Sequence, residues 1–127
     1  MFSIVCPIKN AERFLDRHWN SLVAQKVKPS EVIYVDGGSD DKSLELISNF
    51  SDTRMKCLLI EAPGSSIAEA FNIGIDNSIS DYVCFLNSDD VLMKNHLQCV
   101  KRILELRKFD IVTSDIFFGS GLNTRLI

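Results

Sequence analysis

Several features are missing from this sequence, and each absence excludes a class of protein. No apolar run is long enough to cross a membrane, and the N-terminus has neither the charged region nor the apolar core of a signal peptide. No stretch of lysine and arginine is dense enough for a nucleic-acid surface, and the formal net charge is -3. We therefore expect a protein without a membrane span that does not bind nucleic acid.

The four cysteines lack the paired spacing of a zinc site. They lie far apart and mostly inside apolar runs, at Cys6, Cys57, Cys84 and Cys99. This placement favours buried free thiols over disulfides, which is typical of a reducing compartment. We therefore expect a cytoplasmic protein, either free in solution or at the inner face of the membrane.

Internal repeats and low-complexity linkers are also missing, which indicates a single domain. Of the 127 residues, 46% are hydrophobic and 24% are charged, so the chain can bury a substantial core and is not disordered. Short apolar runs alternate with stretches of helical periodicity. The predicted strands are residues 2–8, 32–35, 55–60, 82–86 and 109–113. This alternation predicts an α/β fold, with a mostly parallel, Rossmann-like sheet flanked by helices.

The run 82–86 organises the prediction, because it ends abruptly in Asn87, Ser88, Asp89 and Asp90. It has no helical period, so we expect a central strand that is buried on both faces. In parallel α/β sheets the ligand crevice forms outside the carboxyl ends of the strands. Carboxylates there can hold a divalent cation that neutralises a diphosphate. The alternative is that these residues form only a turn and a helix cap.

A second strand end is acidic, and a third is a candidate. Asp36 follows the run 32–35 and precedes two glycines, while Asp115 follows the predicted strand 109–113. The segment after Asp36 either approaches a ligand closely or is only a well-formed turn. We expect Ser39 or Asp40 to cap the next helix.

Three further features concern helices. Ser66 and Glu69 have the spacing of a capping box. Gly74, a poor helix residue, indicates either tight packing or an early helix end. Trp19 shares a helical face with apolar residues, so we place it in the core.

Three segments together resemble glycosyltransferase family 2. They are residues 35–39, 66–74 and 85–90, and they occur in the order and spacing of that family. The resemblance runs from residue 2 to about residue 116 and implies the nucleotide-binding half of the GT-A fold. The acceptor half, which carries the general base in the family, is absent, so residues 1–127 are expected to form one truncated domain. Phe117 and Phe118 at the truncated edge are expected to favour self-association.

The resemblance also implies roles for individual residues. Asp36 would hydrogen-bond the nucleotide base, and Asp89, helped by Asp90, would bind Mg²⁺ or Mn²⁺. The implied nucleotide-sugar-binding residues are Pro7, Asn10, Asp36, Gly37, Ser39, Glu69, Asn72, Asn87, Ser88 and Asp89. Asn87 replaces the first acidic residue of the family's Asp-x-Asp-like motif and supplies no charge.

The implied activity is inverting, metal-dependent transfer of a sugar from a nucleotide-diphosphate sugar, with a UDP-sugar as the first choice. The acceptor would be a hydroxyl of a glycan or lipid-linked molecule in cell-surface polysaccharide biosynthesis. Two alternatives remain open. The chain is either a non-catalytic fragment that binds nucleotide or nucleotide sugar, or a phospho-acceptor domain with carboxylates at its strand ends.

Overall fold

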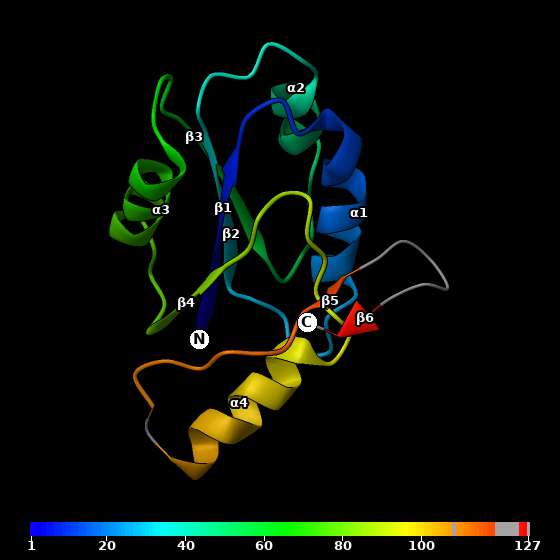
Figure 1. Ribbon diagram of the computed structural model, residues 1–127, viewed down its shortest axis with the longest axis vertical. Helices are drawn as coiled ribbons and strands as arrows, with labels where there is room; N and C mark the ends of the chain where they lie inside the picture. Colours follow the sequence, from blue (N-terminus) through cyan, green and yellow to red (C-terminus); the bar gives the residue numbers. More distant parts are fainter. Residues whose placement is uncertain (108, 119–124, 127) are drawn as a thin grey trace.

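The computed structural model describes residues 1–107, 109–118, 125 and 126, and its centre is a four-stranded parallel sheet (Figure 1). The strand order is β3-β2-β1-β4. The helices and strands along the chain are β1 (Phe2–Ile8), α1 (Glu12–Val23), β2 (Glu31–Asp36), α2 (Ser43–Ser48), β3 (Lys56–Glu61), α3 (Ile67–Asp76), β4 (Tyr82–Phe85), α4 (His96–Leu106), β5 (Phe117–Phe118) and β6 (Arg125–Leu126). The predicted α/β fold with a parallel sheet is confirmed.

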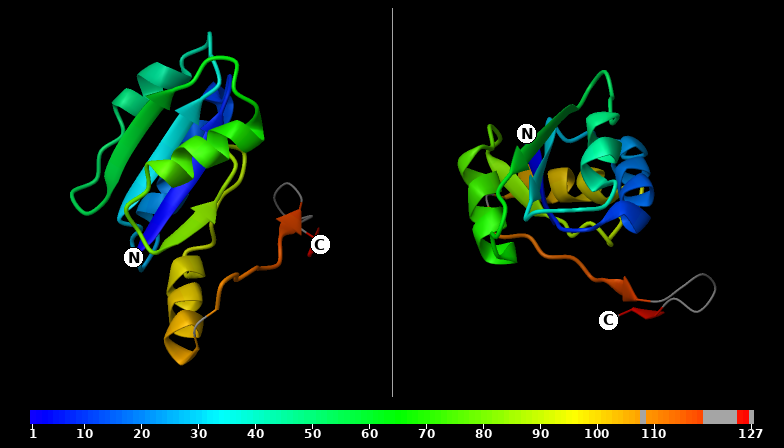
Figure 2. Two further views of the ribbon diagram at one scale, coloured as in Figure 1. Left: turned by 90° about the vertical axis from the view of Figure 1, so that its left-hand side faces the viewer. Right: turned by 90° about the horizontal axis from the view of Figure 1, so that it is seen from above.

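The sheet lies between two helical layers. Helices α1 and α2 cover one face and α3 covers the other, while α4 lies at the end of the sheet where β1 begins (Figures 1 and 2). Every residue of β2 is buried, and β1 is buried except for Pro7, which is half-buried. The two central strands therefore anchor the loops that follow them.

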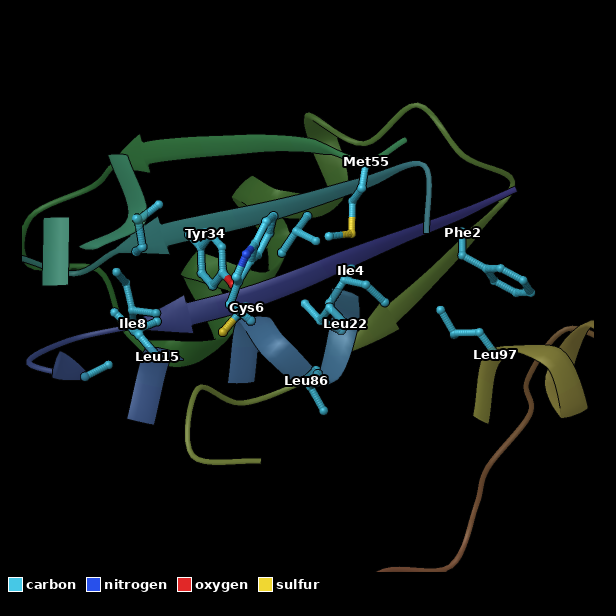
Figure 3. Packing of buried hydrophobic residues seen from close by; sticks show 14 residues of the cluster. Phe2, Ile4, Cys6, Ile8, Leu15, Leu22, Tyr34, Met55, Leu86 and Leu97 are labelled. Atoms are coloured by element: carbon cyan, nitrogen blue, oxygen red, sulfur yellow. The ribbon is translucent and has the colours of Figure 1, made fainter. Parts of the chain in front are cut away.

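The main core fills the space between the sheet and α1 (Figure 3). Leu15 and Leu22 of α1 are fully buried against Cys6 and Tyr34 of the sheet. Trp19 is also buried, and its ring stacks on Phe50 with centroids 4.8 Å apart. The prediction that Trp19 belongs to the core is confirmed.

Helix α3 packs tightly on the opposite face of the sheet. The helix continues to Asp76, so the explanation of Gly74 as an early helix end is wrong. A Cβ atom at Gly74 would lie 2.2 Å from Cγ1 of Val5, which leaves no room for any larger residue. Tight packing is therefore the reason for this glycine.

Two strand predictions are wrong. β4 is an edge strand and only half-buried, with Phe85 55% exposed, because a local sequence pattern does not say how many neighbours a strand has. Residues 109–116 form no strand. They run away from the main sheet (Figure 2), and Ile111 is 78% exposed. The next strand, β5, instead pairs antiparallel with β6 in a separate sheet.

Two further points concern surfaces. The side-chain exposure of Phe117 and Phe118 lies outside what the structure describes, so self-association stays a prediction. Within the described ranges, no helix combines the length and apolar character needed to cross a membrane.

Candidate functional site

Four loops leave the sheet at one edge, because all four strands of the main sheet are parallel (Figure 1). Backbone hydrogen bonds join the first three of these loops. The Gly37 N–H donates to the Ile8 carbonyl at 2.9 Å, and the Gly64 N–H donates to the Gly37 carbonyl at 3.0 Å. This edge carries most of the predicted site residues.

Asp36 ends β2 and is buried, with 2% of its surface exposed. Its carboxylate accepts hydrogen bonds from the N–H groups of Gly38 and Ser39, each at 3.0 Å, and from the Ser39 hydroxyl. Gly38 has φ +102°, a conformation that side chains rarely adopt. Asp36 therefore organises its own turn, and its contact with a nucleotide base stays a prediction.

The β2–α2 loop is bound to the β1–α1 loop. Asn10 has φ +53°; its N–H donates to the Ser39 hydroxyl, and its side-chain oxygen accepts from the Asp40 N–H, both at 2.9 Å. The predicted cap of α2 by Ser39 or Asp40 is wrong: the Ser43 N–H at the start of the helix donates to the Asp41 carboxylate at 2.9 Å instead. Ser39 and Asp40 bond to the neighbouring loop. The pairing holds two predicted site residues, Asn10 and Ser39, side by side.

The β4–α4 loop begins with a tight turn. Leu86 is buried and its N–H bonds to the Val5 carbonyl, while the Asp90 N–H bonds to the Asn87 carbonyl at 3.1 Å. Asn87, Asp89 and Asp90 are exposed. Their side chains are thus available to a ligand at the carboxyl edge.

The loop after β3 leads into α3 through the predicted capping box, which is confirmed. The Ser66 hydroxyl accepts from the Glu69 N–H at 3.2 Å, and the Glu69 carboxylate accepts from the Ser66 N–H at 2.8 Å. Hydrogen bonding from the Ser66 N–H holds the pKa of Glu69 below its usual value. Glu69 is therefore charged and already bonded.

Glu69 and Asn72 lie in an open hollow of about 530 Å³ beside this loop. The hollow is lined by Ala62, Pro63, Gly64, Ser65, Glu69, Asn72, Ile73 and Asp76. The acidic turn after β4 does not line this hollow.

The predicted metal site rests on two adjacent carboxylates. Among residues 1–107 and the other described positions, no three His, Cys, Asp or Glu side chains are grouped to hold a metal ion. Mg²⁺ commonly binds through one or two carboxylates together with water and substrate phosphates. Asp89 and Asp90 therefore fit an ion that arrives with a diphosphate, and not an all-protein cage. The prediction that Asp115 follows a strand is wrong, because residues 109–114, directly before it, form no strand.

Sequence reasoning missed a polar column that runs along α1 and the residues just after it. His18 and Gln25 are buried, and Ser21 is half-buried between them. All three hydrogen-bond the backbone of the β4–α4 loop, which runs beside α1 (Figure 1). The signal was present, since His18 lies between Leu15 and Leu22 on the core-facing side of the helix.

Burial favours the uncharged forms of two titratable side chains beneath the acidic turn, His18 and Cys6. It lowers the pKa of His18 and raises the pKa of the Cys6 thiol, which the nearby Asp89 and Asp90 raise further. Cys6 is therefore a neutral core residue and not a nucleophile.

Comparison with known sequences agrees with the resemblance. The model of the family described as Glycosyl transferase family 2 matches residues 3–126. An uncharacterized glycosyltransferase of Haemophilus influenzae is 36% identical over 99 residues, which cover 77% of this chain and 40% of that protein. The minor teichoic acid biosynthesis protein GgaA of Bacillus subtilis is 35% identical over 108 residues, which cover 79% of this chain and 24% of that protein. The chain thus spans less than half the length of these relatives.

Among solved structures, S. aureus TarS 1-349 in complex with UDP-GlcNAc is similar with a TM-score of 0.73 and 25% identity. The match covers 83% of this chain and 31% of that chain. The shared architecture confirms the predicted GT-A type of sheet.

Proposed function

Because the chain belongs to glycosyl transferase family 2, we propose that it binds a nucleotide-diphosphate sugar at the carboxyl edge of its sheet and forms the donor-binding part of a glycosyltransferase. The observation that carries this proposal is the exposed turn with Asp89 and Asp90 at the same sheet edge as the Asp36 turn. A UDP-sugar is the first choice, which the UDP-GlcNAc complex of TarS supports.

In this proposal Asp89 and Asp90 hold Mg²⁺ or Mn²⁺ together with the diphosphate. When bound, the ion neutralises negative charge on the leaving diphosphate. Asn87 hydrogen-bonds a ribose hydroxyl, for which its amide is suited. Asp36 holds the turn whose Gly37 and Ser39 approach the nucleotide. The remaining proposed contacts are Pro7, Asn10, Glu69, Asn72 and Ser88.

The reaction we propose transfers the sugar to a hydroxyl of a glycan or lipid-linked acceptor with inversion at the anomeric carbon. A general base removes the acceptor proton, and we assign no residue of this chain to that role. The likeness to a teichoic acid biosynthesis protein supports a place in cell-surface polysaccharide synthesis. The four free thiols support a cytoplasmic location.

A second candidate is a nucleotide-sugar-binding fragment without transferase activity. It is favoured by the share of its relatives that the chain spans, which is 40% of one and 24% of the other. A turnover assay with UDP-sugars and several acceptors separates the two. Sugar transfer by the 127-residue chain would exclude the second candidate.

The proposal is tested by calorimetric titration of the chain with UDP, with and without Mn²⁺, and with GDP for comparison. We expect UDP to bind only with Mn²⁺ and the Asp89→Ala variant to lose this binding. Asp81→Ala is a matched control, because Asp81 is also exposed but precedes β4 instead of following it. If the folded protein binds neither nucleotide, the proposal fails.

A further inference from the structure

One face of α1 holds the β4–α4 loop by its main chain. The Arg17 guanidinium donates to the Asp89 carbonyl at 3.3 Å, and His18 Nδ1 lies 3.1 Å from the Asp90 carbonyl. The Leu92 N–H donates to the Ser21 hydroxyl at 3.2 Å. The three contacts follow the same order along the loop and along the helix, starting at the acidic turn.

Gln25, which lies just past the end of α1, extends the same column toward α4. Its amide nitrogen donates to the Met93 carbonyl at 2.8 Å, and its oxygen accepts from the Leu97 N–H at 3.2 Å. Because the bonds from Ser21 and Gln25 also end on main-chain atoms, they fix the path of the loop whatever its side chains are.

His18 is the member that lies under the acidic turn. It is fully buried, and a carbonyl oxygen can only accept a hydrogen bond, so Nδ1 must carry the proton. Its other ring nitrogen, Nε2, is buried and has no hydrogen-bond partner among the residues that the structure describes. A buried polar group with one unpaired atom destabilises the fold relative to an apolar residue. Core packing alone therefore does not explain a histidine here.

We infer that His18, assisted by Ser21, is a positioning residue that holds the turn presenting the Asp89 and Asp90 carboxylates to a nucleoside diphosphate. This inference rests on the proposed function. Neither residue contacts the ligand in this scheme, because both act through backbone atoms of the loop. The carboxylates themselves are exposed, so their placement depends on how firmly the backbone beneath them is held.

Two substitutions at His18 separate the hydrogen bond from packing. His18→Phe keeps a ring of similar shape but has no donor. His18→Asn loses the ring but keeps an N–H donor on Cγ, at the same number of bonds from the backbone as Nδ1. Ile47→Ala on α2 is the control for general loss of stability, because Ile47 is also buried.

The first readout is the affinity for UDP with Mn²⁺, measured by calorimetry on the 127-residue chain. We expect His18→Phe to weaken binding about tenfold, the lower end of the range for groups that hold a metal ligand in place. His18→Asn should stay within about threefold of the unmodified protein, and Ile47→Ala should bind as the unmodified protein does.

The second readout needs no ligand. Amide hydrogen exchange at Leu92 should be faster in His18→Phe and unchanged in His18→Asn, while exchange in β1 and β2 stays the same. If His18→Phe does not fold, Ser21→Ala replaces it, with faster Leu92 exchange and weaker UDP binding expected.

The inference is overturned if the tested variant binds UDP like the unmodified protein, if Ile47→Ala loses affinity equally, or if His18→Asn binds no better than His18→Phe. The proposed function fails by a different result. In that case the unmodified, folded chain binds neither UDP nor GDP with Mn²⁺.

Discussion

Replacing Gly74 by alanine tests how closely α3 sits on the sheet. The new Cβ would lie 2.2 Å from Cγ1, 3.0 Å from Cγ2 and 3.1 Å from Cβ of Val5. Carbon atoms in contact prefer about 3.5–4.0 Å, so α3 or β1 must move by about an ångström. Val5 is fully buried in a central strand, which leaves the side chain little room to rotate away.

Two effects oppose each other in this variant. Alanine favours a helix interior over glycine by about 1 kcal/mol. Overpacking a buried contact costs about 1–3 kcal/mol, and more when backbone must move. With a contact this short the second effect wins, and we expect the free energy of unfolding to fall by about 2 kcal/mol.

Urea denaturation of the single and double variants checks the cause. Val5→Ala alone should cost about 2 kcal/mol, since it removes two buried methyl groups and leaves a cavity. The double variant should be at least about 1 kcal/mol more stable than the sum of the two losses, because the alanine methyl fills that space. Asn72→Ala, at an exposed position of α3, should raise stability by a few tenths of a kcal/mol. A Gly74→Ala variant that is as stable as the unmodified protein would refute this account of the packing.

Four further variants probe other contacts. Ser66→Ala should lower the free energy of unfolding by about 1 kcal/mol through loss of the α3 cap, measured by urea denaturation. The pKa of Glu69 is lowered in the folded state, so its contribution to the free energy of unfolding is complete above its unfolded pKa near 4.5 and is lost as pH falls through the folded pKa. Glu69→Gln should therefore make the free energy of unfolding depend less on pH, measured by urea titrations at pH 3–6. An unchanged pH dependence would contradict this account. Asp36→Asn should cost about 1–3 kcal/mol in urea, since an amide accepts fewer of the turn's hydrogen bonds, and an unchanged midpoint would count against its role in the turn. Trp19→Ala should lower the free energy of unfolding by about 3–5 kcal/mol, measured by thermal unfolding, because the ring is buried and stacks on another ring. A much smaller decrease would mean that the ring is not a core contact.

The sequence predicted β1, β2 and β3 to within a residue at each end. Each of these strands is an apolar run bounded by polar residues, and the parallel arrangement follows from the intervening helices. The capping box at Ser66 was also predictable, because both partners lie within four residues of each other. Local rules were enough for these elements.

The failures concern partners that are distant in the sequence. Whether β4 lies at an edge depends on which chain segment, if any, pairs with its other side, and residues 109–113 do not. Gly74 was ambiguous for the same reason, because its neighbour Val5 is 69 positions away in the chain. His18 was overlooked since its partner, the Asp90 carbonyl, is a backbone atom that every residue type possesses.

The hydrogen bonds between α1 and the main chain of the β4–α4 loop have a consequence for engineering. Val91, Met93, Lys94 and Asn95 are exposed, and the hydrogen bonds that fix this stretch to α1 and the residues just after it use its backbone atoms. These four positions can therefore be randomised together while the loop keeps its course. A library built on them would vary the surface next to the acidic turn while the hydrogen-bonded backbone beneath it stays the same.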